Sequence, residues 1–274
     1  MMATINGTNR GETLAGTSGG DTINALDGDD SLFGKAGDDT LKGGEGGDEL
    51  DGGAGSDVLN GGTGSGVDTA DYRSFSNGVN VNLVLGSADD GTGIDTLISI
   101  ENVDGTSFRD TIIGDQVGNF LTGQAGSDFI SANGGTDTIL AGDGNDTVLG
   151  GSGFDKIDGG RGADTLTGGG EVDHFIYFSA GDSPVGNGAR DTIKDFEKGL
   201  DKINVSLIDA NPEVSGNQAF SFIGSGSFND EGQIRASAVN GGTLLQFNTS
   251  GNTVADFEIF LEKPIQMSGL DFFL

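Results

Sequence analysis

Acidic residues recur every nine positions along most of this sequence. They form two runs, in which the spacing changes only once, at an eleven-residue step before Asp68. The positions are Glu12, Asp21, Asp30, Asp39, Asp48, Asp57 and Asp68, followed by Asp110, Asn119, Asp128, Asp137, Asp146, Asp155, Asp164 and Asp173. A single aspartate of this kind is an ordinary turn residue. Carboxylates repeated in phase instead suit a hard cation such as Ca²⁺, which takes several oxygen ligands.

The residues around each acid follow the same period. A large apolar residue stands two positions after each acid, as at Ile23, Leu41, Ile130 and Ile157, and glycine stands two positions before most of them. A nine-residue period fits no face of a helix, whereas the short apolar triplets favour brief strands. Glycine adopts positive φ values without steric cost, so the glycine-rich remainder predicts a turn. Each repeat is therefore expected to be one turn and one strand.

Two repeats then make one coil of a flattened solenoid with the apolar side chains between its two sheets. The sequence predicts an all-β fold, a right-handed parallel β-roll (β-solenoid) in two repeat blocks. Acids eighteen residues apart stack along each edge, so Asp128 should lie over Asp146 and Asp137 over Asp155. The predicted metal ligands are carboxylates and glycine carbonyls: Asp21, Asp30, Asp39, Asp48, Asp57, Asp110, Asp128, Asp137, Asp146, Asp155, Asp164 and Asp173, with Gly37, Gly46, Gly55, Gly126, Gly135, Gly144, Gly153 and Gly162.

Composition narrows the classes of function. The formal net charge is −30, with 53 glycines and 3 prolines, which without a cation would favour disorder. Nucleic acid is not an expected partner, because no basic surface is available to bind phosphate. No cysteine is present and His174 is the one histidine, so thiolate and multi-histidine zinc sites are excluded. The first residues lack the features of an N-terminal signal peptide, and no apolar stretch is long enough to span a membrane.

The best copies of the repeat are "GGSGFDKID" (150–158), "GGRGADTLT" (159–167) and "GGAGSDVLN" (52–60). They resemble the G-G-x-G-x-D-x-U-x nonapeptide of RTX (repeats-in-toxin) proteins, which form calcium-binding parallel β-rolls. This resemblance implies several bound Ca²⁺ ions and an extracellular location. Some copies depart from the pattern: Asn119 is uncharged, Arg109 stands beside Asp110, Glu171 replaces a glycine before Asp173, and Glu12 is interpreted as part of a cap.

The composition changes after Phe175, where phenylalanine becomes frequent. The blocks "DTIKDFEKGLDKINVS" (191–206), "NQAFSFIGSGSF" (217–228) and "TLLQFNTSGNTVADFEIFL" (243–261) resemble the C-terminal region of serralysin-type proteases and of alginate epimerase modules. In that family the region caps the roll and carries an uncleaved signal for type I (ABC) export, which would place the signal at Asp271, Phe272, Phe273 and Leu274. The implied organisation is a first repeat block at 1–68, a strand-rich insert or cap at 69–104, a second block at 105–175 and a β-rich cap with the secretion signal region at 176–274.

These features predict a secreted, non-catalytic protein that folds on binding Ca²⁺ after export. No nucleophile motif, phosphate loop or zinc set is present, and His174 is interpreted as a packing or surface residue. An alternative is a module that binds acidic polysaccharide or a cell surface, with help from Arg161, Arg190, Lys194, Lys198 and Lys202. A second alternative is a small membrane-active RTX protein, and membrane association stays open at this stage.

Overall fold

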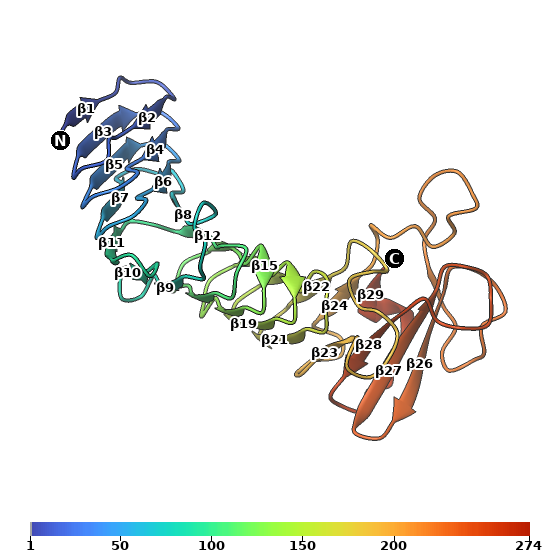
Figure 1. Cartoon of the computed structure of the whole chain (residues 1–274). Coiled ribbons are helices and arrows are strands. Elements are labelled where there is room, and N and C mark those ends of the chain that lie inside the picture. Colours follow the sequence, from blue (N-terminus) through green and yellow to red (C-terminus); the bar gives the residue numbers. More distant parts are fainter. Residues whose placement is uncertain (1) are drawn as a thin grey trace. The chain divides into compact units, whose positions relative to one another are not determined.

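The computed structural model describes residues 2–274 and divides the chain into two compact units, Met1–Ala132 and Asn133–Leu274. Within the described residues nearly all regular structure is β-strand, joined only by a short 3₁₀ turn at Gly269–Asp271. Both units contain short strands stacked in successive coils (Figure 1). No helix among residues 2–274 is long and apolar enough to cross a membrane.

Unit 1 consists of two mainly parallel sheets formed by alternate strands. From β1 to β8 each strand pairs with the strand two elements along the chain, in a register that places Ile23 beside Leu41 and Leu32 beside Leu50. The first sheet begins with β1 (Thr4–Asn6), β3 (Thr22–Asp27), β5 (Thr40–Glu45), β7 (Val58–Gly62) and β11 (Ile94–Ile98). The second contains β2 (Thr13–Ala15), β4 (Ser31–Phe33), β6 (Glu49–Asp51), β8 (Thr69–Asp71), β12 (Asn102–Asp104) and β14 (Phe120–Thr122).

The predicted insert continues the roll and adds a short antiparallel segment. The strand β11 pairs parallel with β7, and β12 pairs parallel with β8, so both sheets extend through residues 94–104. Between them, β9 (Asn80–Asn82) and β10 (Ser87–Asp89) pair antiparallel, as do β10 and β11. The strand β9 then pairs parallel with β13 (Thr111–Ile113), which pairs with β16 (Phe129–Ser131) and restarts the regular coils. The two-residue strand β15 (Ala125–Gly126) also belongs to this unit.

Unit 2 begins as a roll and ends in a larger antiparallel region. One sheet contains β17 (Thr138–Leu140), β20 (Lys156–Asp158), β22 (His174–Ile176), β24 (Lys202–Asn204) and β29 (Phe272–Phe273). The other begins with β19 (Thr147–Ser152), β21 (Thr165–Gly170), β23 (Asp191–Ile193) and β28 (Phe257–Leu261), joined by β27 (Gly242–Asn248), β26 (Gln233–Val239) and β25 (Ser221–Phe222). The strand β18 (Asp143–Gly144) lies in a turn of this unit.

The core of the coils is narrow, because each short strand of the two sheets directs one large aliphatic residue inward. Ile23, Leu41 and Leu59 in unit 1, and Ile157 and Val148 in unit 2, have no exposed surface. In the C-terminal region the core widens and becomes aromatic. The rings of Phe247 and Phe257 stack there with centroids 4.0 Å apart. The chain therefore has a thin core through the repeats and a thicker one at the end of unit 2.

Glycine columns run beside the aspartates. All eight glycines predicted as turn residues have φ between +108° and +155°. Turn glycines eighteen residues apart stack closely, so that a Cβ on Gly153 would overlap the carbonyl oxygen of Gly135. Both backbone conformation and lack of space therefore require glycine at this position.

Replacing Gly153 by alanine should destabilise the roll far more than the same change at Gly188. Both glycines have positive φ, at +120° and +91°, so each substitution incurs backbone strain of about 1–2 kcal/mol. Only Gly153 also meets a backbone oxygen, whereas no atom lies within 4 Å of the Cβ position on Gly188. Urea unfolding in saturating calcium measures the difference, and equal loss of stability in the two variants would contradict the close stacking.

Candidate calcium sites

The predicted aspartates of unit 1 form two ladders, one along each edge of the roll. On the first edge the backbone N–H of Asp21 donates to Oδ1 of Asp39, at 2.5 Å, and that of Asp39 donates to Oδ1 of Asp57, at 2.7 Å. On the second edge the N–H of Asp30 donates to Asp48 and that of Asp48 donates to Asp68, both at 2.8 Å. Further along, the N–H of Asp110 donates to Oδ1 of Asp128, at 2.7 Å. Stacking at the eighteen-residue period is therefore present.

The same ladders occur in unit 2. The N–H of Asp137 donates to Oδ1 of Asp155, at 3.0 Å, and the N–H of Asp155 donates to Asp173, at 3.1 Å. On the other edge the N–H of Asp146 donates to Oδ1 of Asp164, at 2.8 Å. Each bond uses Oδ1 of a carboxylate to hold the neighbouring coil, so Oδ2 of the same carboxylate takes no part in it.

The second oxygens are buried and lack hydrogen-bond donors. Within the described residues this holds for Oδ2 of Asp30, Asp39, Asp48, Asp57, Asp155, Asp164 and Asp173. In several turns Oδ2 packs against the glycine five residues earlier. A Cβ on Gly34 would lie 2.6 Å from Oδ2 of Asp39, and a Cβ on Gly150 would lie 2.6 Å from Oδ2 of Asp155. An unpaired buried carboxylate oxygen is costly unless a cation or a proton neutralises it. Hard anionic oxygens beside glycine-rich turns fit the ligand chemistry of Ca²⁺.

The electrostatics lead to the same conclusion. Burial raises the pKa of Asp57 and of Asp173 to about 7, and the charges of neighbouring aspartates add to this effect. Burial, together with repulsion by Asp191, also raises the pKa of Asp164, and burial raises that of Asp191. Asp21 differs, because hydrogen bonds from Thr17 lower its pKa. Without a cation, burial therefore disfavours the charged form of these carboxylates.

The ladders extend beyond the acids found from the strict nine-residue spacing. In the insert, Asp57 donates its N–H to Oδ1 of Asp95 at 2.9 Å, and Asp68 donates to Glu101 at 2.9 Å. In unit 2 the final rungs are Asp191, which accepts from Asp164 at 2.9 Å, and Asp201, which accepts from Asp173 at 3.1 Å. These residues were missed because insertions shift their spacing. The signal that survives is an acid two positions before an inward apolar residue, as in "DTL", "DTI" and "DKI".

Irregular copies show where the ladder chemistry changes. The amide of Asn119 donates to the carbonyl of Glu101 at 2.7 Å and its Oδ1 accepts from the N–H of Asp115 at 2.9 Å, so it serves as a neutral rung. Glu12 also acts as a rung, since its N–H donates to Asp30 at 2.7 Å. Beside Asp68 and Glu101 lies a hollow of about 170 Å³ lined mainly by glycines.

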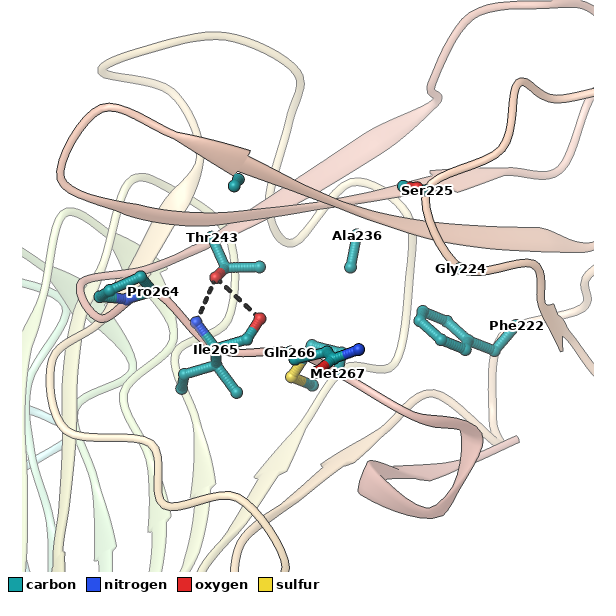
Figure 2. Close-up of a pocket in the computed structure, with 10 residues that line it drawn as sticks. Phe222, Gly224, Ser225, Ala236, Thr243, Pro264, Ile265, Gln266 and Met267 are labelled. Carbon is teal, nitrogen blue, oxygen red and sulfur yellow. Dashed lines mark hydrogen bonds between the residues drawn. The ribbon is translucent and has the colours of Figure 1, made fainter.

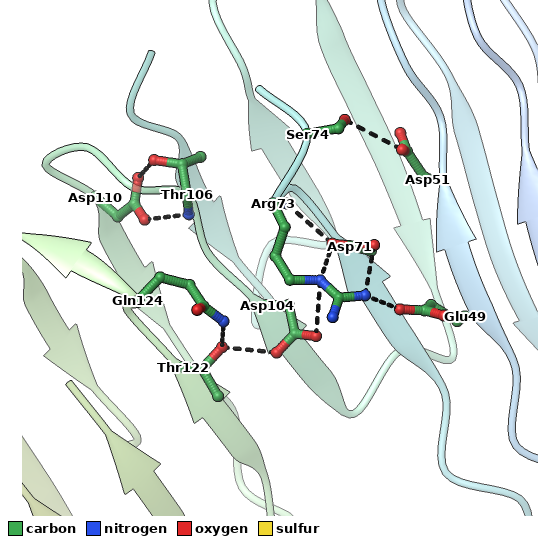
Figure 3. A network of polar contacts seen from close by, with 10 residues as sticks. All are labelled: Glu49, Asp51, Asp71, Arg73, Ser74, Asp104, Thr106, Asp110, Thr122 and Gln124. Carbon is green, nitrogen blue, oxygen red and sulfur yellow. Dashed lines mark hydrogen bonds and ion pairs between the residues drawn. The ribbon is translucent and has the colours of Figure 1, made fainter. Parts of the chain in front are cut away.

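A second acidic cluster lies on the strands β6, β8 and β12 of unit 1, but it contains its own cation. The carboxylates of Glu49, Asp71 and Asp104 approach one another closely enough to hold a metal ion. Figure 3 shows the guanidinium of Arg73 among them. Arg73 pairs with Asp71 at 2.8 Å, lies 3.5 Å from Asp104 and also pairs with Glu49. The guanidinium thus supplies positive charge where the ladders have only acids.

Two other features of unit 2 are a pocket in the C-terminal region and the histidine, His174. A pocket of about 460 Å³ in the C-terminal region, shown in Figure 2, is lined by uncharged residues, including Phe222, Thr243 and Met267. His174 lies edge-on between Phe154 and Phe273, with ring centroids 4.5 and 4.9 Å away. Burial lowers its pKa, and the charges of nearby lysines lower it further. The acids, rather than these features, form the site.

Fold and ladders together define a calcium-binding β-roll. A profile described as "Peptidase M10 serralysin C terminal" matches residues 56–270, and one for the RTX calcium-binding nonapeptide repeat, in four copies, matches residues 6–41 and 33–68. The chain belongs to the serralysin C-terminal family and carries RTX calcium-binding repeats. Its cofactor is calcium, bound as several ions. The assignment of individual ligands stays a prediction, as does the division of the sequence into segments 1–68, 69–104, 105–175 and 176–274.

Solved structures with low similarity include two subunits of a mannuronan C5-epimerase from Azotobacter vinelandii. The R3 subunit of AlgE6 is 25% identical, with a TM-score of 0.35, over 57% of this chain and 71% of that one. The R2 subunit is 24% identical, with a TM-score of 0.32, over 61% and 91%. The extracellular lipase LipA of Serratia marcescens is 17% identical, with a TM-score of 0.29, and this chain spans 40% of its length. Among curated proteins none matches the sequence.

The calcium-free protein should become more stable as the pH is lowered from about 8 to 5. The folded-state pKa values of Asp57 and Asp173 are about 7, above their unfolded value of about 3.9. Such groups stabilise the fold below the unfolded pKa and lose that contribution as the pH rises through the folded pKa. Circular dichroism after removal of calcium measures the trend, as the β-sheet signal retained at each pH.

Saturating calcium should remove or reverse this trend, because the ion and the proton compete for the same carboxylates. A calcium-free protein that retains more β-sheet signal at pH 8 than at pH 5 would contradict the assignment of buried, unpaired carboxylates.

Proposed function

We propose that this protein is a non-catalytic, secreted β-roll that is exported by a type I (ABC) machinery and folds when it binds Ca²⁺ outside the cell. The observation that carries the proposal is the double ladder of buried aspartates whose second oxygens lack donors. Without cations these carboxylates repel one another within a chain of net charge −30. Cation binding free energy then becomes folding free energy.

A calcium-gated fold suits passage through an exporter. Inside a cell Ca²⁺ is scarce, so the chain stays extended, whereas extracellular modules bind Ca²⁺ with dissociation constants of about 10⁻⁴–10⁻³ M. Two of the four residues of the predicted signal, Asp271 and Phe272, are buried in the folded state, whereas Phe273 is exposed. Asp271 is buried and accepts hydrogen bonds from the N–H and hydroxyl of Ser268, at 2.7 and 3.0 Å. Phe272 is buried and pairs with Ile203 of β24. Recognition of these residues therefore favours an unfolded chain.

The ladder also explains the presence of the acids without assigning them a catalytic role. Paired carboxylates recur at every coil, and each carboxylate accepts the same hydrogen bond from the backbone N–H of the preceding rung. A glycosidase pair would instead consist of two acids set apart from the rest by their surroundings. We therefore assign the acids to cation binding.

Removing calcium should unfold the coils. The full chain, purified in calcium and then treated with EGTA at pH 8, is expected to lose its β-sheet circular dichroism, which should return when Ca²⁺ is added in excess. Adding Mg²⁺ is the matched control, because Mg²⁺ demands a tight octahedron and retains its waters. A β-sheet spectrum unchanged by EGTA would refute calcium-gated folding.

A second candidate function, binding of acidic polysaccharide, has its own supporting observation. On the strands β20, β22 and β24, Lys156, His174 and Lys202 occupy register positions beside one another. Adjacent strands lie about 4.8 Å apart, so these three residues form a short row. Phe154 and Phe273 flank it. Two lysines on either side of His174, with aromatic rings beside them, fit the carboxylates and apolar ring faces of a uronate chain.

Most of the cations suggested by the sequence are already engaged. Arg190 pairs with Glu258 at 3.0 Å, and Lys194 pairs with Glu262 at 2.9 Å. Lys198 donates to the carbonyl of Gln266. Lys202 also donates to a carbonyl, that of Leu270, at 2.8 Å. Lys156 is exposed and contributes the most accessible charge of the row.

Lys156→Gln should weaken binding of short uronate oligosaccharides several-fold in calcium-saturated protein at low salt, because surface charge attraction is screened by salt. Lys42→Gln is the matched control, since Lys42 is also exposed on a strand but belongs to β5 of unit 1. Calorimetry provides the comparison. Equal affinity of the Lys156 variant and the unaltered protein would argue against this row as a glycan site.

A further inference from the structure

We propose that unit 2 binds a neutral sugar in a pocket built around Phe260 and Arg190, on the outer face of its larger sheet. The pocket has a volume of about 650 Å³, within the range of about 300–1,000 Å³ that is usual for small-molecule sites. It is separate from the row of Lys156, His174 and Lys202, which belongs to the other sheet. The site therefore adds a second kind of ligand to the calcium ions.

Three neighbouring strands form the floor of the pocket. The strands β21, β23 and β28 lie side by side (Figure 1), in a register that places Thr165 beside Thr192 and Thr192 beside Phe260. Successive side chains of a strand point to opposite faces of the sheet, and the adjacent residues Leu166 and Ile259 are buried in the core. Two hydroxyls and one aromatic ring therefore form a line on the outer face.

Two loops form the walls of the pocket. The loop before β23 contributes Asn187 and Arg190, and the turn between β26 and β27 contributes Asn240. The guanidinium carbon of Arg190 lies 5.6 Å from the centroid of the Phe260 ring. On the other wall, a Cβ on Gly242 would lie 2.9 Å from the same ring. Both loops thus converge on Phe260, which stays partly exposed between them.

The charges around the pocket disfavour an anionic ligand. Nη1 of Arg190 donates to Oε2 of Glu258 at 3.0 Å, so the guanidinium already has a counter-ion. Glu258 is buried and is held there by the amide of Gln246, which donates to its Oε1 at 2.6 Å. Asp164, an acid of the ladder, also borders the pocket. A carboxylate or phosphate would have to displace Glu258 beside a second acid, whereas an uncharged ligand meets no such penalty.

The remaining polar groups suit the hydroxyls of a sugar. Within residues 2–274 the hydroxyls of Thr165 and Thr192 have no hydrogen-bond partner. The same holds for the side-chain amides of Asn187 and Asn240, which are both exposed. Hydroxyls and amides can both donate and accept, as sugar hydroxyls do, and an aromatic ring offers an apolar surface to the C–H face of a pyranose. The pocket therefore fits one pyranose ring of a neutral glycan, stacked on Phe260.

Ligand-observed NMR with the full chain in saturating calcium tests the site. Saturation-transfer difference spectra with cellopentaose, maltopentaose and mannopentaose should show transfer to at least one of these sugars. The affinity should not change when NaCl is raised, because screening by salt acts on charged partners. A uronate pentasaccharide is the charged counterpart, and it should not displace the neutral sugar.

Three variants locate the binding. Phe260→Leu keeps apolar bulk but removes the flat ring, and it should weaken binding about five- to tenfold. Asn240→Ala removes a hydrogen-bonding group from an exposed turn and should weaken binding about three- to tenfold, as should Thr192→Val. Thr147→Val is the matched control for Thr192→Val, because Thr147 lies beside Thr165 on the same face but outside the pocket lining, and its affinity should stay unchanged.

Three outcomes would overturn the site: no transfer to any of the neutral pentasaccharides, equal affinities of Asn240→Ala and the unaltered protein, or displacement of the neutral sugar by the uronate. Circular dichroism in calcium accompanies each variant, and Asn240→Ala keeps the test decisive if Phe260→Leu does not fold. Because binding is measured on folded protein, its failure leaves calcium-gated folding intact. Persistence of the fold in EGTA would refute calcium-gated folding and leave the sugar site intact.

Discussion

The hydrogen bond from the backbone N–H of one aspartate to the carboxylate of the aspartate in the next coil is the interaction on which the rest depends. It fixes the spacing of the coils, as between Asp39 and Asp57 or Asp155 and Asp173. It also creates the central difficulty of the fold, because the second carboxylate oxygen is buried with no donor. The same residue thus specifies the architecture and demands a cation.

The thin core makes that demand decisive for stability. Each repeat buries one aliphatic side chain, such as Leu41 or Ile157, and much of the remaining chain is glycine. Glycine loses more conformational entropy on folding than other residues, yet Gly153 cannot be replaced without overlapping the coil beneath it. Hydrophobic burial alone offsets little of this entropy. Under the proposed function, cation binding to the acid columns supplies what the core does not, and the aromatic end of unit 2 provides a more conventional packed region.

The two acidic environments of unit 1 show two ways to neutralise crowded carboxylates. At Glu49, Asp71 and Asp104 the chain supplies the charge itself through Arg73. Along the ladders no basic side chain takes this role among the described rungs, and their oxygens face glycine-rich turns. The insert carries the ladder onward through Asp95 and Glu101 instead of interrupting it. Its irregular length changes where the acids fall in the sequence but leaves them on the same edges of the sheets.

The sequence by itself determined the repeat, the parallel roll, the inward aliphatic residues and the identity of the cofactor, because these follow from local spacing: an acid, an apolar residue and a glycine at fixed offsets. It also predicted the stacking at eighteen residues that joins Asp39 to Asp57. Only the tertiary structure decided that Asp95, Glu101, Asp191 and Asp201 continue the ladders, that Arg73 enters an acidic cluster and that Tyr72 meets Asp95. These contacts join residues separated by irregular lengths of chain, so strand pairing, rather than a period, brings them together.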